Sequence, residues 1–323
     1  MATMRVLVIG PFGQDAHFIF SALSTKPNVK LYGVNHSESS ERFAAFKISH
    51  PSVQVQVKDL SKKSECKATL DAINPLFIFH LAAVHSSVNM MHLLNDEQAL
   101  AMWNCHHMIT ENLIDWMSHN RESRLIFAAS SQVFAGHKSG TRICESSQPL
   151  PVNEYGKSKF ASWQLIQEAR ESLNLHLSCG ILFNHTSEFS KSEFLFPNLV
   201  EQVVQIIEGR QSVIKVRNQS SFIDISYAGE IAIGLIAMAE CKNPGDYVLG
   251  SGNSSKVSRI VEKALTNLGL ETHKISLQST EALNEERCLV SDPTKARKIL
   301  GWKVILAPDE ILTRMVQARV SLR

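Results

Sequence analysis

The stretch RVLVIGPFGQDAHF, residues 5–18, decides the fold of this chain. It places Gly10, Gly13 and a small third residue at GxxGxxA spacing, directly after a short apolar and β-branched run. Glycine permits a tight turn and lets backbone N–H groups approach a pyrophosphate, which then lies at the positive end of the following helix. Because the motif opens a strand–turn–helix unit, it predicts a dinucleotide-binding turn with Gly10, Gly13, Gln14 and Asp15 at the cofactor.

Outward from this turn, short apolar runs alternate with longer amphipathic stretches. The predicted strands are 5–10, 29–35, 53–59, 76–83, 124–131 and 175–184, and the predicted helices are 14–24, 62–73, 97–119, 153–172 and 194–208. Strands that are apolar on both faces and separated by helices form a parallel sheet covered on both sides. We therefore predict an α/β fold, a doubly wound parallel sheet of the Rossmann type.

The pattern loosens after about residue 185, where polar and glycine-rich stretches interrupt shorter elements. We predict a nucleotide-binding core over residues 1–184, to which later segments such as 212–240 return. The remainder, mainly residues 185–323, is predicted to form a smaller C-terminal substrate-binding lobe.

The composition excludes several classes of protein. The formal net charge of +2 comes without a basic block, which argues against nucleic acid as the main partner. No apolar run reaches the roughly 18 residues that span a bilayer, and the N-terminus lacks the anatomy of a signal peptide. The six cysteines are scattered without CxxC spacing, so we expect reduced thiols in a cytoplasmic protein with no metal site and no membrane partner.

The ends of the next strands indicate how a dinucleotide would be held. The second strand ends at Asn35 and His36, where an acidic residue would bind the ribose 2′-hydroxyl of NAD. No carboxylate stands there, and His36 suits a 2′-phosphate, so NADP(H) is favoured while NAD(H) stays possible. Asp59 and Leu60 end the third strand and are expected at the adenine. Small residues at the end of the fourth strand let a cofactor lie close to the backbone, which adds Leu81, Ala82 and Ala83.

A proton-handling group is predicted at the same edge of the sheet. The fifth strand ends in Ser130 and Ser131, and Tyr155 and Lys159 follow at i and i+4 on one helical face. Lowering the pKa of a tyrosine from about 10 to near 7 takes roughly 4 kcal/mol, which one ammonium about 4 Å away supplies at an effective dielectric of about 20. We predict Tyr155 as proton donor, Lys159 as the group that tunes it, and Ser131 as the hydrogen-bond donor to the substrate oxygen.

With these motifs the chain resembles the extended short-chain dehydrogenases and reductases, the NAD-dependent epimerases and dehydratases of nucleotide sugars. The most similar branch is that of the GDP-mannose 4,6-dehydratases. The resemblance rests on GPFGQDA (10–16), HLAA (80–83), the Ser131–Tyr155–Lys159 spacing, GILFNHTS (180–187), KARKILGWK (295–303) and the C-terminal RMVQARVSLR (314–323). It implies a nucleotide-sugar substrate contacted by Asn184, and it places Asn104 at the structural asparagine of the family.

The chain departs from the dehydratases at the base that removes the C5 proton. Those enzymes carry a glutamate two residues after the catalytic Ser/Thr, whereas this chain has Val133. Valine cannot accept a proton, so elimination would need another residue. The segments that border the cleft offer His85, His137, Glu145 and His185, although for each of them a role as a loop or packing residue is favoured over a role as the base.

Two arginines that bind the substrate diphosphate in the family are also missing. Ile223 precedes Asp224 where an arginine is usual, and Ala282 stands at the second position. A diphosphate prefers bidentate, charge-assisted donors. Arg217 and Arg287 are the nearest substitutes, and with His85 they complete the expected substrate contacts.

The surviving residues support hydride transfer without the elimination base. This favours a 4-ketosugar reductase or an epimerase that uses Ser131, Tyr155 and Lys159. The alternatives are a GDP-mannose-type 4,6-dehydratase with a relocated base, or a non-catalytic NADP-binding regulator on the same fold.

The resemblance also implies a homodimer, in which the helices at 97–119 and 153–172 pair with those of a second copy. The first of these helices carries an apolar stripe that fits either a partner or the sheet. The stripe consists of Trp103, Ile109, Leu113, Trp116 and Met117.

Overall fold

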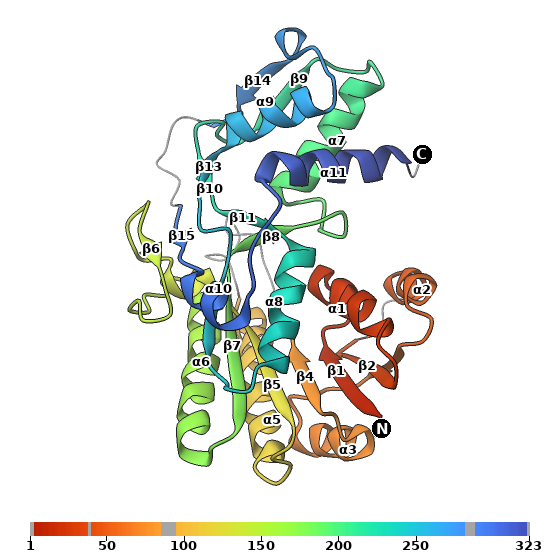
Figure 1. Ribbon diagram of the computed structural model, residues 1–323, viewed down its shortest axis with the longest axis vertical. Helices are drawn as coiled ribbons and strands as arrows, with labels where there is room; N and C mark the ends of the chain where they lie inside the picture. Colours follow the sequence, from red (N-terminus) through yellow and green to blue (C-terminus); the bar gives the residue numbers. More distant parts are fainter. Residues whose placement is uncertain (1–2, 38–39, 85–94, 282–287, 322–323) are drawn as a thin grey trace.

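A seven-stranded sheet forms the centre of the protein (Figure 1). The computed structural model describes residues 3–37, 40–84, 95–281 and 288–321. The strand order is β12-β7-β5-β4-β1-β2-β3, and every pair of neighbours is parallel. This confirms the predicted doubly wound α/β fold.

The six strands predicted from apolar runs are all present. The strands of the sheet are β1 Met4–Ile9, β2 Val29–Asn35, β3 Gln54–Val57, β4 Phe77–His80, β5 Arg124–Ser130, β7 His176–Leu182 and β12 Asp246–Leu249. The seventh, β12, is only four residues long, and it joins the sheet beside β7. A run this short does not stand out in the sequence from the buried helix before it.

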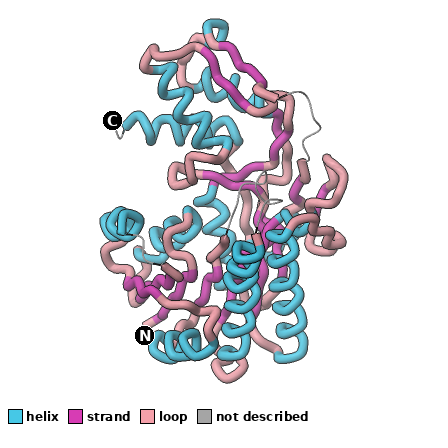
Figure 2. Tube along the Cα trace, turned by 180° about the vertical axis from the view of Figure 1, so that it is seen from behind, coloured by secondary structure: helices cyan, strands magenta, loops and turns pink. Residues whose placement is uncertain are grey.

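Two layers of helices cover the sheet, and each encloses its own hydrophobic core. One face carries α1 (Gln14–Ser24) and α8 (Ala228–Glu240), which pack on each other. The other face carries α3 (Lys63–Ile73), α5 (Ile109–Met117) and α6 (Glu154–Leu173). Figure 2, seen from behind, shows α5 and α6 running along this second face.

The long helix predicted at 97–119 consists of three parts. α4 (Asp96–Trp103) leads into a π-helical turn, η2 (Asn104–Met108), and then into α5. The apolar stripe of this helix faces the sheet, because four of its five residues are buried: Ile109, Leu113, Trp116 and Met117. Trp103 is the one that remains exposed.

A smaller lobe lies at the end of the sheet toward which β1 runs (Figure 1). It contains α7 (Leu195–Ile207), α9 (Val257–Asn267) and α11 (Pro308–Ser321) around a separate core, with the parallel pair β9 (Val213–Val216) and β14 (Ser276–Ser279). The remaining elements are α2 Ser40–Ser49, η3 Ser131–Phe134, β6 Arg142–Ile143, β8 Asn184–Thr186, β10 Phe222–Ile223, β11 Ile225–Tyr227, β13 Ser255–Lys256, η4 Thr272–Lys274, β15 Val290–Ser291 and α10 Thr294–Leu300. A smaller C-terminal lobe is thus confirmed, while its boundary at residue 184 stays a prediction.

Three negative findings apply to the described part of the chain. None of its helices is both long and apolar enough to cross a membrane. No group of three or more His, Cys, Asp or Glu side chains within it is arranged to hold a metal ion. All six cysteines lie in this part and are free thiols.

Candidate active site

The glycine turn lies at the point where the strand order reverses. β1 neighbours both β2 and β4, so the chain leaves β1 in one direction and continues from β4 in the other. Ligands of open α/β sheets bind in the crevice at such a point, beyond the carboxyl ends of the strands. Gly10 has φ +86°, and a Cβ there would lie 2.8 Å from the Cα of Ala82. Only glycine fits this close approach of the turn to the end of β4.

The side chains of Gln14 and Asp15 bind the protein itself. Gln14 donates from Nε2 to the carbonyl of His185 at 3.2 Å, and its Oε1 accepts from the hydroxyls of Ser187 and Ser190 at 2.8 and 2.7 Å. Asp15 pairs with Nε2 of His185 at 3.2 Å. These contacts join the start of α1 to the segment after β7.

Both nitrogens of His185 are engaged. Nε2 faces Asp15, and Nδ1 donates to the carbonyl of Phe183 at 2.8 Å. Burial disfavours the charged form, but the Asp15 carboxylate and this carbonyl outweigh it and raise the pKa of His185 above its ordinary value. Because Nδ1 carries a hydrogen, Nε2 is the one nitrogen of His185 that could accept a proton, and it already faces Asp15.

The outer end of the cofactor crevice is built around Asp59. Its carboxylate accepts from the backbone and hydroxyl of Ser61 at 3.1 and 2.6 Å, and Nδ1 of His36 lies 3.6 Å away. His36 is exposed, as its predicted role at a 2′-phosphate requires, while the side chain of Leu60 is buried in the core. Asn35 ends β2 with its amide on the carbonyl of Ser37.

A close contact between η3 and the start of α6 places the proton-handling residues. Asn153 caps α6 by accepting from the backbone of Gly156 at 2.8 Å, and its Nδ2 donates to the side chain of Gln132 at 3.2 Å. A Cβ on Gly156 would lie 2.6 Å from the carbonyl oxygen of Gln132. The glycine of the EYGKSK segment therefore allows Tyr155 to approach the end of β5.

Tyr155 is almost completely buried and forms a hydrogen bond with Ser130. Burial raises the pKa of Tyr155 to about 12; the hydrogen bond with Ser130 opposes this rise, and the nearby Cys105 and Asp15 add to it. Ser130 was missed as a site residue, although its place in the Ser130-Ser131 pair was a usable signal. Among the described residues, the hydroxyl of Ser131 has no hydrogen-bond partner, which leaves it available to a substrate oxygen.

Lys159 is also buried, but the expected lowering of the tyrosine pKa is absent. Its Nζ donates to the carbonyl of Ala128 at 2.8 Å and lies 4.7 Å from the ring centroid of Phe127 and 5.9 Å from that of Tyr155. Burial lowers the pKa of Lys159 to about 8, although Cys105 and Cys179 favour its charged form. The prediction that one ammonium would lower the pKa of the tyrosine from about 10 to near 7 was wrong for this structure, because it left out the desolvation of both groups.

The position of the missing elimination base lies in the core. Val133 is 0% exposed and packs among the apolar residues between the sheet and α6. Of the substitutes, His137 is bonded to the carbonyl of Gln148 on an exposed loop, and Glu145 accepts from the backbone of Val248 at 2.8 Å. His85 lies outside the described residues.

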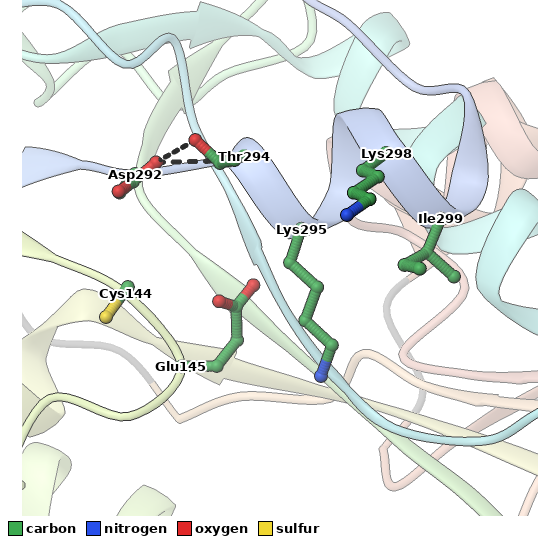
Figure 3. A pocket seen from close by; sticks show the side chains of 7 residues that line it. All are labelled: Cys144, Glu145, Asp292, Thr294, Lys295, Lys298 and Ile299. Carbon is green, nitrogen blue, oxygen red and sulfur yellow. Dashed lines mark hydrogen bonds between the residues drawn. The ribbon is translucent and has the colours of Figure 1, made fainter.

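Glu145 belongs to a separate pocket of about 360 Å³ (Figure 3). The pocket is lined by Cys144, Glu145, Asp292, Thr294, Lys295, Lys298 and Ile299. None of the three proton-handling residues lines it, so its carboxylates are no substitute for the missing base.

The predicted substrate contacts are only partly assembled. Asn184 is exposed, and its Nδ2 donates to the carbonyl of Asp224 at 3.2 Å. Asp224 is itself buried and accepts from the backbones and hydroxyls of Ser251 and Ser291. Arg217 pairs with Glu281 at 2.6 Å on the surface. Arg287 and Ala282 lie outside the described residues.

Comparisons with known proteins agree with this geometry. Residues 7–315 match the family described as GDP-mannose 4,6 dehydratase. GDP-mannose 4,6 dehydratase 1 of Arabidopsis thaliana is 25% identical over 98% of this chain and 90% of its own length. A GDP-mannose 4,6-dehydratase of Sinorhizobium fredii is 27% identical over 55% of this chain, and there the chain spans only 56% of the relative.

Solved structures share the fold at low identity. A dTDP-glucose 4,6-dehydratase from Bacillus anthracis, solved with NAD, has a TM-score of 0.80 at 15% identity and covers 99% of this chain and 97% of its own. A UDP-N-acetylglucosamine 4-epimerase from Methanobrevibacter ruminantium has the same score at 20% identity over the whole of both chains. RMD from Pseudomonas aeruginosa, solved with NADPH, scores 0.78 at 16% identity over 99% of each chain. With the family match over nearly its whole length, the chain belongs to the GDP-mannose 4,6-dehydratase family, within the NAD-dependent epimerases and dehydratases of the extended short-chain dehydrogenase/reductase type.

Proposed function

We propose that the protein is an NADP(H)-dependent 4-ketosugar reductase, or an epimerase, that acts at C4 of a nucleotide sugar. The observation that carries the proposal is the combination of Tyr155 and Lys159 beside the end of β5 with a buried valine, Val133, where the elimination base of a dehydratase would stand. Of its possible substitutes, His185 has both nitrogens engaged by Asp15 and the carbonyl of Phe183, and Glu145 lines a separate pocket. Proton donation is supported, and abstraction of the C5 proton is not.

The residues divide the chemistry between them. NADPH, when bound, supplies the hydride for the carbonyl carbon. Tyr155 gives its proton to the carbonyl oxygen, and the hydroxyl of Ser131 orients that oxygen by donating a hydrogen bond. Burial makes the phenol resist ionisation, and a charged Lys159 one helical turn away would stabilise the phenolate that forms. An epimerase uses the same groups twice, first to oxidise and then to reduce one carbon.

The glycine turn and the end of β2 support NADP(H) as the cofactor. Gly10 opens the turn between β1 and α1 at which a pyrophosphate would bind, and His36 stands exposed where NAD enzymes carry an acidic residue. Asp59 accepts a hydrogen bond from Ser61 and follows β3, the strand next to β2. There we expect it to contact the adenine. The protein of this fold from Pseudomonas aeruginosa was solved with NADPH.

A 4,6-dehydratase with a relocated base is the second candidate. The family match over residues 7–315 and the relative from Arabidopsis thaliana favour it. It requires a base at another position, such as His85, which lies outside the described residues.

A homodimer is part of the proposal. The stripe of α5 is turned toward the sheet, so a partner would contact the exposed apolar side chains of α4, Leu100 and Trp103, together with α6. Light scattering at micromolar concentration is expected to give twice the mass of one chain, and a monomer contradicts the dimer.

The function is tested by mass analysis of products. The protein is incubated with NADPH and the 4-keto-6-deoxy derivative of GDP-mannose, and separately with NADP and GDP-mannose. A gain of two hydrogens by the ketosugar with consumption of NADPH supports a reductase. An isomer formed without net use of cofactor supports an epimerase. Loss of one water from GDP-mannose establishes the dehydratase, and NADPH binding without turnover of either sugar supports a regulator.

A further inference from the structure

A histidine that the proposed chemistry does not use lies against the proton donor. His106 belongs to the π-helical turn Asn104–Met108, and its side chain is 0% exposed. Its ring is nearly perpendicular to that of Tyr155, at an interplanar angle of 87° and a centroid distance of 5.4 Å. Single π-helical turns within α-helices are less favourable than continuous helix, and they occur frequently at functional sites.

A hydrogen-bonded chain connects His106 to the backbone of Tyr155. Nδ1 of His106 lies 2.8 Å from the hydroxyl oxygen of Ser158, and that hydroxyl donates to the carbonyl of Tyr155 at 3.0 Å. Ser158 has a single hydroxyl hydrogen and gives it to the carbonyl, so its oxygen accepts from Nδ1. Thr110 in turn donates to the carbonyl of His106 at 2.6 Å, which fixes the π-helical turn.

Tyr155 needs this support because of its place in the helix. It is the second residue of α6, which begins at Glu154. The first turn of a helix lacks its own hydrogen-bond partners and frays readily. Asn153 caps this turn by accepting from the backbone of Gly156. His106 contacts the same turn from another helix, through its hydrogen bond to Ser158.

We propose that His106 is a positioning residue for Tyr155, which fixes the first turn of α6 and the orientation of the phenol through Ser158. The inference rests on the proposed function, in which Tyr155 is the proton donor. A misplacement of about 1 Å at a reacting group can reduce the rate about 100-fold. Loss of the hydrogen bond is therefore expected to lower kcat and to leave the binding of NADPH nearly unchanged.

Three substitutions separate the hydrogen bond from the bulk of the side chain. His106→Leu keeps the volume and removes the donor, while His106→Asn keeps a donor one bond beyond Cγ, where Nδ1 lies. His106→Gln places its donor one bond further out. We expect His106→Leu and His106→Gln to lower kcat by about 100-fold with KM for NADPH within about twofold, and His106→Asn to recover most of the loss.

Ser158→Ala breaks the same chain from the other helix. It is expected to lower kcat in the same direction and to add little to His106→Leu, because the two changes remove one interaction. His107→Leu is the matched control on the same turn. The ring of His107 lies on Trp103 at 4.5 Å, away from this chain, so its loss is expected to leave kcat unchanged.

A second measurement is independent of turnover. The protein has four tyrosines, so labelling with 3-fluorotyrosine gives four fluorine NMR signals, and Tyr155→Phe identifies the one from Tyr155. His106→Leu is expected to shift that signal alone, and His106→Asn to return it toward its original position.

An unchanged Tyr155 signal in His106→Leu, or equal Tyr155 signals in the Leu and Asn variants, overturns the proposal. If His106→Leu disturbs all four signals, Ser158→Ala is measured instead, and an unchanged Tyr155 signal in that variant overturns the proposal. If no sugar nucleotide is turned over, the proposed function fails, and the NMR signal still decides the role of His106.

Discussion

Replacing Lys159 with methionine is expected to stabilise the protein while removing its activity. Lys159 is 1% exposed, and among the described residues its ammonium makes one hydrogen bond, to the carbonyl of Ala128 at 2.8 Å. Burial lowers its pKa from 10.5 to about 8, which corresponds to about 3 kcal/mol against the charged form in the folded state. Methionine fills a similar volume without a charge. The carbonyl of Ala128 then lacks its hydrogen bond, which lowers the free energy of unfolding by about 1 kcal/mol. A net gain of about 2 kcal/mol in the free energy of unfolding follows at pH 7.

The gain must depend on pH in a defined direction. The pKa of Lys159 in the folded state is below its unfolded value, so the folded state binds fewer protons between about pH 8 and pH 10.5. The penalty of wild type is therefore fully present below about pH 8, and it disappears as the pH rises to about 10.5. The difference between variant and wild type is expected to shrink over this window.

Urea unfolding at pH 7 and at pH 10 measures both effects. Lys157→Met is the matched control, because Lys157 pairs with Glu154 at 2.7 Å on the exposed face of α6. Its substitution is expected to change the free energy of unfolding by less than about 0.5 kcal/mol at either pH. A Lys159→Met variant that is less stable than wild type at pH 7, or equally stabilised at both pH values, refutes the reasoning.

Three further substitutions test the site. Tyr155→Phe is expected to lower kcat by about 10²- to 10⁴-fold with little change in NADPH affinity, measured by steady-state kinetics and fluorescence titration; retained activity would assign the proton to another group. Gly10→Ala is expected to abolish NADPH binding in the same titration, because the new methyl group meets Ala82 at 2.8 Å and alanine is strained at φ +86°; unchanged affinity would place the cofactor elsewhere. His36→Ala is expected to weaken NADPH more than NADH, since only NADPH carries the 2′-phosphate; an equal loss for both would contradict a contact with that phosphate.

The sequence predicts those features of the fold and site that local pattern determines. Strands that are apolar on both faces indicate a covered parallel sheet, and their order along the chain places Gly10 next to Ala82 at the switch point. The i, i+4 spacing of Tyr155 and Lys159 likewise survives in α6. These features depend on residues close in the chain or on the general rules of doubly wound sheets.

Contacts between distant segments account for what the sequence does not reveal. The side chain of Gln14 binds Ser190, 176 residues away, and His106 binds Ser158, 52 residues away. No periodicity encodes either pairing, and the π-helical turn that contains His106 has no sequence signal of its own. The pKa of Tyr155 was mispredicted for the same reason, because desolvation depends on everything that packs around the phenol.

Transfer of deuterium from NADPH labelled at C4 to a 4-keto nucleotide sugar tests the central claim most directly. We expect the product to carry one deuterium on the former carbonyl carbon, and we expect this transfer to be lost in Tyr155→Phe. GDP-mannose is expected to lose no water under the same conditions. Water lost from GDP-mannose, without deuterium in the ketosugar product, would contradict it and show that another residue supplies the base that Val133 lacks.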